Sequence, residues 1–223
     1  MSNNPTKLTA SDLAALMCAR ICHDLVSPIG ALGAALEVLD DESNSDMHDD
    51  AMELIRSSAG QAANKLKYLR LAFGAGTSAP GVVGLEQLRS MVQDMYGEGK
   101  AEIAWNTELD GVEKSTARLL LNLVMVALQS IPRGGTLTID VTRSPDSDLI
   151  SLKAEGPKAR IYEEFEKALN GKAPAEGFDG RSIQPFYTGM LVRQLKGRLD
   201  WSLTDETVQY SVFIPHEAAQ SAA

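Results

Sequence analysis

The sequence predicts an α+β fold: an N-terminal antiparallel helical hairpin that forms a four-helix bundle by dimerisation, followed by an α/β sandwich. Apolar residues recur at steps of three and four through residues 9–73, as in helices that pack lengthwise. Beyond the glycine-rich stretch 74–81, helical and alternating patterns are mixed. We therefore place a helical-hairpin dimerisation domain at 1–75, an α/β domain at 82–217 and a tail at 218–223.

The overall composition excludes several classes of partner. The 223 residues are 44% hydrophobic and 23% charged, which is ordinary for a soluble globular protein. The net charge of −9 argues against nucleic acid, because phosphate binding needs a basic surface. The N-terminus shows no basic region followed by an apolar run, and the longest apolar run, 119–128, is too short to span a bilayer. We expect a cytoplasmic protein with no nucleic-acid or membrane partner.

The first predicted helix is capped by Thr9 or Ser11 and ends near position 39. Cys18 and Cys22 lie four residues apart on it, and we interpret them as small packing residues rather than redox, haem or metal ligands. The predicted buried stripe comprises Ile21, Leu25, Ile29, Leu32, Leu36 and Leu39.

His23 stands on the opposite side of this helix. It is two residues away from two stripe positions, so at about 100° per residue it points roughly 160–200° away from the stripe. Arg20 lies on a nearby face, where it would bind phosphate or be an ordinary solvated arginine. Pro28 deprives the Asp24 carbonyl of its helical donor, which predicts a kink or a loosened turn beside His23. The small residues on the histidine's face predict a docking surface for another protein: Ser27, Gly30 and Ala34.

A second helix follows the polar loop 40–46, with Asn44 or Ser45 as its cap, and ends at Gly74. Two such helices joined by a short loop form an antiparallel hairpin. Each apolar stripe is wider than one partner helix covers, so two copies would complete a four-helix bundle in a symmetric homodimer. We interpret the basic residues of this helix as a solvated face: Lys65, Lys67 and Arg70.

The C-terminal part mixes helices with strands. It predicts one mostly antiparallel sheet with helices on one side. The expected helices cover 85–96, 113–131, 160–169 and 183–195, and the expected strands cover 101–105, 136–142, 148–154, 199–203 and 208–214.

The stretch 23–29, His-Asp-Leu-Val-Ser-Pro-Ile, resembles the phosphoacceptor box of bacterial sensor histidine kinases. The order of domains is also similar, and residues 121–127, Leu-Asn-Leu-Val-Met-Val-Ala, resemble the kinases' first ATP box with Asn122 kept.

The departures from the kinase pattern all fall on the nucleotide site. Val126 stands where kinases carry a magnesium-binding asparagine, and valine offers no oxygen ligand. Ala154 replaces the aspartate that reads adenine, Lys158 replaces a glycine, and Gly189 is alone in the lid region. We therefore expect no ATP, cofactor or metal to be bound by this chain.

A kinase-like chain that keeps its histidine and loses the ATP site is similar to the ChpT family of histidine phosphotransferases, over essentially its whole length. The resemblance implies that His23 takes a phosphoryl group from the receiver aspartate of a hybrid kinase, CckA in that bacterial cell-cycle phosphorelay. It then passes the group to receivers of response regulators such as CtrA and CpdR, with Mg²⁺ supplied by the receiver. The remaining hypotheses are an ATP-dependent kinase with an atypical pocket and a non-catalytic adaptor for response regulators.

The roles of the residues beside His23 stay open from the sequence. Asp24 would orient the imidazole or accept a proton, or would be a solvated surface acid. Ser27 would contact the transferred group, or would be a small residue that allows close approach.

Overall fold

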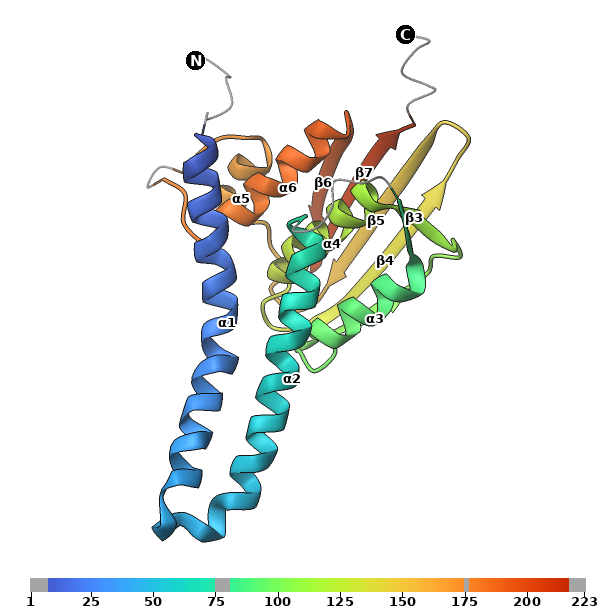
Figure 1. Cartoon of the computed structure of the whole chain (residues 1–223). Coiled ribbons are helices and arrows are strands. Elements are labelled where there is room, and N and C mark those ends of the chain that lie inside the picture. The colour runs from blue at the N-terminus through green and yellow to red at the C-terminus, as the bar shows by residue number, and fades with distance from the viewer. Residues whose placement is uncertain (1–7, 75–80, 175–176, 217–223) are drawn as a thin grey trace.

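The computed structural model describes residues 8–74, 81–174 and 177–216, and it shows a long helical hairpin attached to a layered α/β domain (Figure 1). Helix α1 is Ala10–Asp40 and helix α2 is His48–Ala72, and they run antiparallel. Thr9 is the cap of α1, and its hydroxyl accepts a 3.1 Å hydrogen bond from the Asp12 N–H. The predicted hairpin and one of its two alternative caps are therefore confirmed.

The start of α2 differs from the prediction. Asn44 and Ser45 do not cap it, because both lie in the 3₁₀ helix η1, Glu42–Met47, and the cap position is Met47. Short 3₁₀ turns commonly lead into α-helices, and they are hard to distinguish from a polar loop in a sequence. Helix α2 ends as predicted, with Gly74 in the left-handed region at φ 72°.

The buried stripe of α1 is only partly as predicted. Pro28 and Ala35 are its buried residues, whereas the predicted stripe residues Ile29 and Leu36 are 54% and 52% exposed. Cys18 and Cys22, expected to pack, are also exposed. At about 100° per residue, the two cysteines, Val26, Ile29 and Leu36 fall within roughly 40° of Cys22, so they form one second apolar face. The predicted stripe therefore spans two adjacent faces of α1, and α2 packs against one of them.

The main sheet has five strands in the order β2-β4-β5-β7-β6, and the predicted mostly antiparallel sheet is confirmed. Only the β2–β4 pair is parallel. Side chains alternate between a buried and an open face, and the helices cover the buried face (Figure 1). The strands are β2 (Ala101–Trp105), β4 (Gly135–Arg143), β5 (Ser147–Glu155), β6 (Arg198–Thr204) and β7 (Thr207–Pro215).

Four helices accompany the sheet: α3 (Leu85–Tyr96), α4 (Lys114–Ser130), α5 (Glu163–Leu169) and α6 (Ile183–Gln194). A second, two-stranded sheet joins β1 (Val82–Gly84) to β3 (Gly111–Glu113) and was not predicted. Three-residue strands are too short to show an alternating pattern.

The hairpin and the α/β domain share buried contacts. Tyr68 is fully buried and its hydroxyl donates a 2.7 Å hydrogen bond to the Leu121 carbonyl of α4. The first turns of α1 pack near α6, where Leu13, Leu16 and Met17 contact a cluster that includes Phe186. The predicted domain boundary stays a prediction, since the central residues of the linker, 75–80, lie outside the described residues.

Helix α1 is long and apolar enough to meet a simple criterion for a membrane span. A single helix of this kind is weak evidence for a membrane span, because the core helix of a soluble protein and a signal sequence meet the same criterion. The cytoplasmic location therefore remains an expectation.

Candidate functional site

His23 lies near the middle of α1, with 67% of its side chain exposed. Its predicted outward orientation is confirmed. The three small residues predicted to surround it, Ser27, Gly30 and Ala34, are exposed as well. A Cβ atom added to Gly30 would meet nothing within 4 Å, so the surface beside the imidazole is open. This arrangement gives a protein-sized partner access to the ring.

Asp24 is not a solvated surface acid, because only 13% of its side chain is exposed. Its Oδ1 lies 3.4 Å from His23 Nδ1, which is a long hydrogen bond. When Nδ1 carries the proton it donates to this carboxylate, and Nε2 is left with a lone pair. Burial raises the pKa of Tyr96, on α3; the charge of Arg20 lowers that pKa and the charge of Asp24 raises it.

Arg20 is also largely enclosed, with 13% of its side chain exposed. Its Nε lies 3.1 Å from Asp24 Oδ2 in an ion pair whose geometry is not that of a hydrogen bond. Its Nη1 donates to the Gly180 carbonyl at 3.4 Å, so a loop before α6 contacts α1 one turn before His23. The docking role predicted for Arg20 stays a prediction.

The main-chain carbonyl of Asp24 has a partner outside its own helix. Pro28 has no N–H to give it, and Lys65 of α2 donates from Nζ at 3.0 Å. The predicted loosened carbonyl is thus bonded to the neighbouring helix, and α1 continues unbroken. Sequence reasoning missed Lys65, although an unpaired carbonyl four residues before a buried proline requires a donor.

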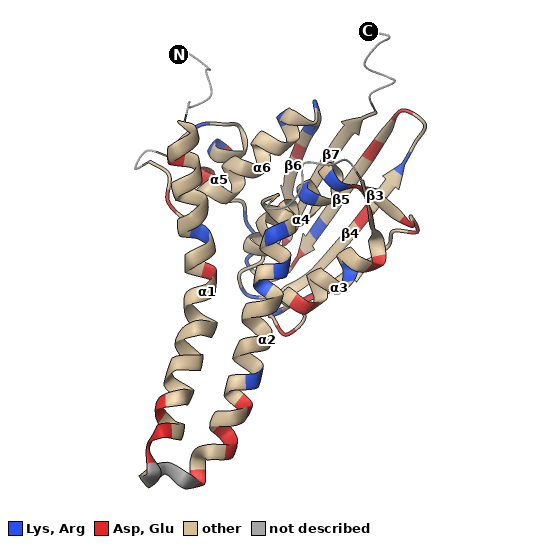
Figure 2. Cartoon of the chain, viewed as in Figure 1, with Lys and Arg blue, Asp and Glu red and all other residues tan. Residues whose placement is uncertain are grey.

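Charge is unevenly distributed along the hairpin. Basic residues are concentrated in the C-terminal half of α2, whereas acidic residues are concentrated at the hairpin tip (Figure 2). His23 therefore lies in the less acidic part of a chain whose net charge is −9. An acidic partner surface would be attracted to this part of the hairpin.

Two of the positions that resemble kinase ATP boxes are occupied by core residues, and a third, Lys158, is exposed. Val126 and Ala154 are fully buried in the core, and Lys158 has a φ of 63°. A Cβ added at Gly189 would overlap the Leu169 carbonyl oxygen, so this glycine lets α6 approach α5.

Asn122 is fully buried and connects three helices. Its Nδ2 donates to the Ala72 carbonyl of α2 at 2.6 Å and to the Arg118 carbonyl of its own helix at 2.7 Å. Its Oδ1 accepts a 2.6 Å hydrogen bond from Gln184 Nε2 of α6. The residue that resembles part of an ATP box is therefore engaged in internal hydrogen bonds.

A polar cavity of about 570 Å³ lies outside the His23 site. It is lined by Tyr162, Glu163, Glu164, Lys167, Pro174, Gly177, Asp179 and Ser182. Among the described residues, no group of three or more His, Cys, Asp or Glu side chains is placed to hold a metal ion.

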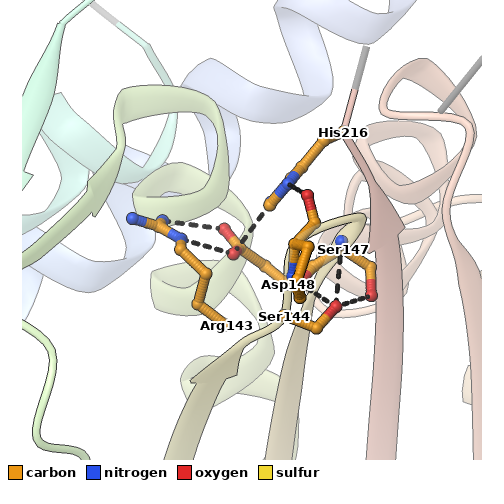
Figure 3. Close-up of polar contacts among 6 residues, drawn as sticks. Arg143, Ser144, Ser147, Asp148 and His216 are labelled. Atoms are coloured by element: carbon orange, nitrogen blue, oxygen red, sulfur yellow. Dashed lines mark hydrogen bonds and ion pairs between the residues drawn. The ribbon is translucent and has the colours of Figure 1, made fainter. Parts of the chain in front are cut away.

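A buried carboxylate anchors the far end of the sheet (Figure 3). Asp148 accepts hydrogen bonds from Arg143 Nε at 2.7 Å and from His216 Nε2 at 3.1 Å. Burial alone would raise the pKa of Asp148, but the bonds from Arg143 and His216 outweigh it and lower that pKa. The bond to Asp148, and a second one to the Pro145 carbonyl, raise the pKa of His216. The cluster joins the β4–β5 hairpin to the end of β7.

Known proteins resemble this chain over almost its full length. Residues 85–207 match the family model of the histidine phosphotransferase C-terminal domain. The chain is 34% identical over 207 residues to protein phosphotransferase ChpT of Brucella abortus (strain 2308), covering 93% of this chain and 98% of that protein.

Solved structures extend the similarity. A bacterial phosphotransferase solved at 1.7 Å aligns with a TM-score of 0.82 and 33% identity, over 93% of this chain and 98% of that one. The histidine kinase AdeS of Acinetobacter baumannii aligns more weakly, over 87% of this chain and 98% of that one at 13% identity and a TM-score of 0.47. The chain belongs to the histidine phosphotransferase family that includes ChpT.

Proposed function

We propose that this chain is a phosphorelay carrier that holds a phosphoryl group on His23 and exchanges it with the aspartates of receiver domains. The observation that carries the proposal is the geometry at His23: an imidazole that is 67% exposed, with Nδ1 facing the Asp24 carboxylate. The ChpT-type family membership supports the same activity.

The chemistry needs one nucleophilic nitrogen and correct positioning. The Nε2 lone pair attacks the phosphorus of an aspartyl phosphate, a P–N bond forms, and the P–O bond breaks as the aspartate leaves with its electron pair. Asp24 accepts a hydrogen bond from the Nδ1–H, which holds the ring proton on Nδ1 and so keeps Nε2 available as the nucleophile. The receiver would bring the Mg²⁺ that neutralises the phosphoryl oxygens. The reverse attack, by an acceptor aspartate, completes the transfer.

The open surface around His23 would form the docking site. Ser27, Gly30 and Ala34 present little bulk, and Arg70 adds positive charge on the neighbouring helix. This suits the acidic pocket of a receiver domain. By family resemblance, the donor would be a hybrid kinase of the CckA type, and the acceptors would be regulators of the CtrA and CpdR type.

A second copy of the chain would cover the second apolar face of α1. Val26, Ile29 and Leu36 are 68%, 54% and 52% exposed there, and Leu66 of α2 is 51% exposed. Apolar faces of this kind on a two-helix hairpin suit a four-helix bundle. Light scattering should give about twice the 24.0 kDa chain mass, and a monomer would contradict the bundle.

The carrier role is supported by the residues at the ATP-box positions. Val126 and Ala154 are buried in the core, and Asn122 is committed to internal hydrogen bonds. These side chains would have to leave the core to contact a nucleotide. We therefore infer that the phosphoryl donor is another protein.

The test uses a purified, radiolabelled receiver domain of a hybrid kinase as donor. We expect label to reach the wild-type chain and not the His23→Ala variant. This variant should keep the circular dichroism spectrum of the wild type and its molar mass in light scattering. Label on that variant would contradict the proposal. Label on His23 after Mg-ATP alone would instead favour a kinase, and receiver binding without any transfer would favour an adaptor.

A further inference from the structure

Asp24 is held at two separate points. Its carboxylate lies between Arg20 Nε, at 3.1 Å, and His23 Nδ1, at 3.4 Å. Its main-chain carbonyl, which Pro28 leaves without a helical donor, accepts a 3.0 Å hydrogen bond from Lys65 Nζ. Charged donors make the shorter and stronger hydrogen bonds in proteins. The backbone of this turn is therefore fixed from α2.

We propose that Lys65 is a positioning residue for phosphoryl transfer, acting through the Asp24 carbonyl. This rests on the proposed function of His23. The bond between His23 Nδ1 and the Asp24 carboxylate is already long, so a small rotation of the turn breaks it. Without Lys65, the Asp24 carbonyl turns toward water, and the carboxylate no longer holds the proton on Nδ1. The orientation of the His23 imidazole, and which of its two nitrogens carries the lone pair, are then less well defined.

Lys67 provides a matched control on the same helix. It carries the same charge two residues further on, is 57% exposed, and its closest acidic partner is Asp94 at 3.9 Å. Replacing either lysine by methionine removes one positive charge and keeps most of the apolar stem. A difference between the two variants therefore reports the contact with the Asp24 carbonyl rather than the general charge of the hairpin.

Pro28 provides a second control, because it creates the need for Lys65. In a Pro28→Ala chain the new alanine N–H donates to the Asp24 carbonyl within α1. The contribution of Lys65 should then largely disappear. The two substitutions are predicted to be strongly non-additive, as expected for residues that share one acceptor.

The experiment measures transfer from a phosphorylated receiver at saturating concentration, and the ¹⁵N NMR signals of the His23 ring. Misplacement of a reacting group costs about 10–100-fold in rate, and we expect a loss in this range for Lys65→Met, with little change in the receiver concentration for half-maximal rate. The ring signals should shift away from the form protonated at Nδ1. Lys65→Arg should recover most of the rate, and Lys67→Met should stay close to wild type.

Each outcome separates this inference from the proposed function. If wild type is not labelled at His23, the proposed function fails. If wild type is labelled and Lys65→Met transfers equally well, or if Lys67→Met is equally slow, the inference is overturned while the carrier role stands. If Lys65→Met does not fold, the chain that carries both Lys65→Met and Pro28→Ala tests the inference in its place. The inference requires that chain to be folded and active, and a folded but inactive double variant overturns it.

Discussion

The Asn122→Ala substitution tests whether this residue serves the fold. In the native chain its amide joins α2 to α6 through the Ala72 carbonyl and the Gln184 side chain, each at 2.6 Å. Alanine removes both connections. The Arg118 carbonyl keeps its helical partner, so only two buried groups lose a partner.

The magnitude follows from those two groups. An unsatisfied buried donor or acceptor costs about 1–3 kcal/mol, which gives roughly 2–6 kcal/mol for the pair. Gln184 already has a buried Oε1 without a partner, so its amide would be left with no hydrogen bond at either end. For a chain of this size 1 kcal/mol changes Tm by about 2–4 °C, so we expect Tm to fall by on the order of 10 °C.

Thermal unfolding followed by circular dichroism measures this, with Gln129→Ala as the matched control. Gln129 lies on the same helix, is part-buried, and donates only to the Met125 carbonyl within that helix, at 3.1 Å. Its loss should change Tm by a few degrees at most. If Asn122→Ala lowers Tm no more than the control does, the connection between the three helices contributes little and the reasoning is refuted.

Three further predictions each concern a single residue. Because the pKa of His216 is raised in the fold by Asp148, its contribution to the free energy of unfolding is complete below the unfolded pKa near 6.5 and is lost as pH rises through the folded value. Urea unfolding should therefore separate His216→Asn from wild type more at pH about 5.5 than at pH about 8.5, and an equal gap would contradict this. Gly189→Ala should lower Tm, because its Cβ overlaps the Leu169 carbonyl oxygen, and an unchanged Tm would show that α6 shifts freely. Ile29→Lys should convert the proposed dimer to a monomer in light scattering, and a persistent dimer would place the interface elsewhere.

The elements of the fold were predictable because their patterns are long. Helix α1 has 31 residues and the main antiparallel strands, β4, β5 and β7, have nine each, so periodicity has room to appear. The three-residue strands β1 and β3 offer no period, and the 3₁₀ helix before α2 has the composition of a loop. Length separated the strands that were predicted from those that were missed, and a loop-like composition concealed the 3₁₀ helix.

The two apolar faces of α1 show a different limit. Steps of three and four residues connect Ile21 and Leu25 to Ile29 and Leu36, although α2 covers the first pair better than the second. A helical period identifies apolar residues and their angles. It does not tell which face packs within the chain and which is left for another molecule, because that depends on where α2 returns.

The features of the site that were predicted depend on positions within one helix, whereas those that were missed depend on contacts between residues far apart in the sequence. The exposure of His23 and the carbonyl released by Pro28 follow from positions on one helix, and both were predicted. The distant contacts that support Asp24 were not, because Lys65 is 41 residues away from Asp24, and Gly180 is 160 residues away from Arg20, which contacts Asp24. A sequence shows that a carbonyl needs a donor, but only the fold shows which donor reaches it.

These distant partners connect the α/β domain to the exposed histidine. The Gly180 carbonyl holds Arg20, Arg20 pairs with Asp24, and the Asp24 carboxylate faces His23 Nδ1. On the other side, the helix that carries Lys65 is anchored to α4 through Tyr68. Both supports of Asp24 therefore depend on the α/β domain, one through the loop before α6 and one through α2. Through these contacts the α/β domain would position His23 of the proposed carrier, since both supports act through the backbone and side chain of one aspartate.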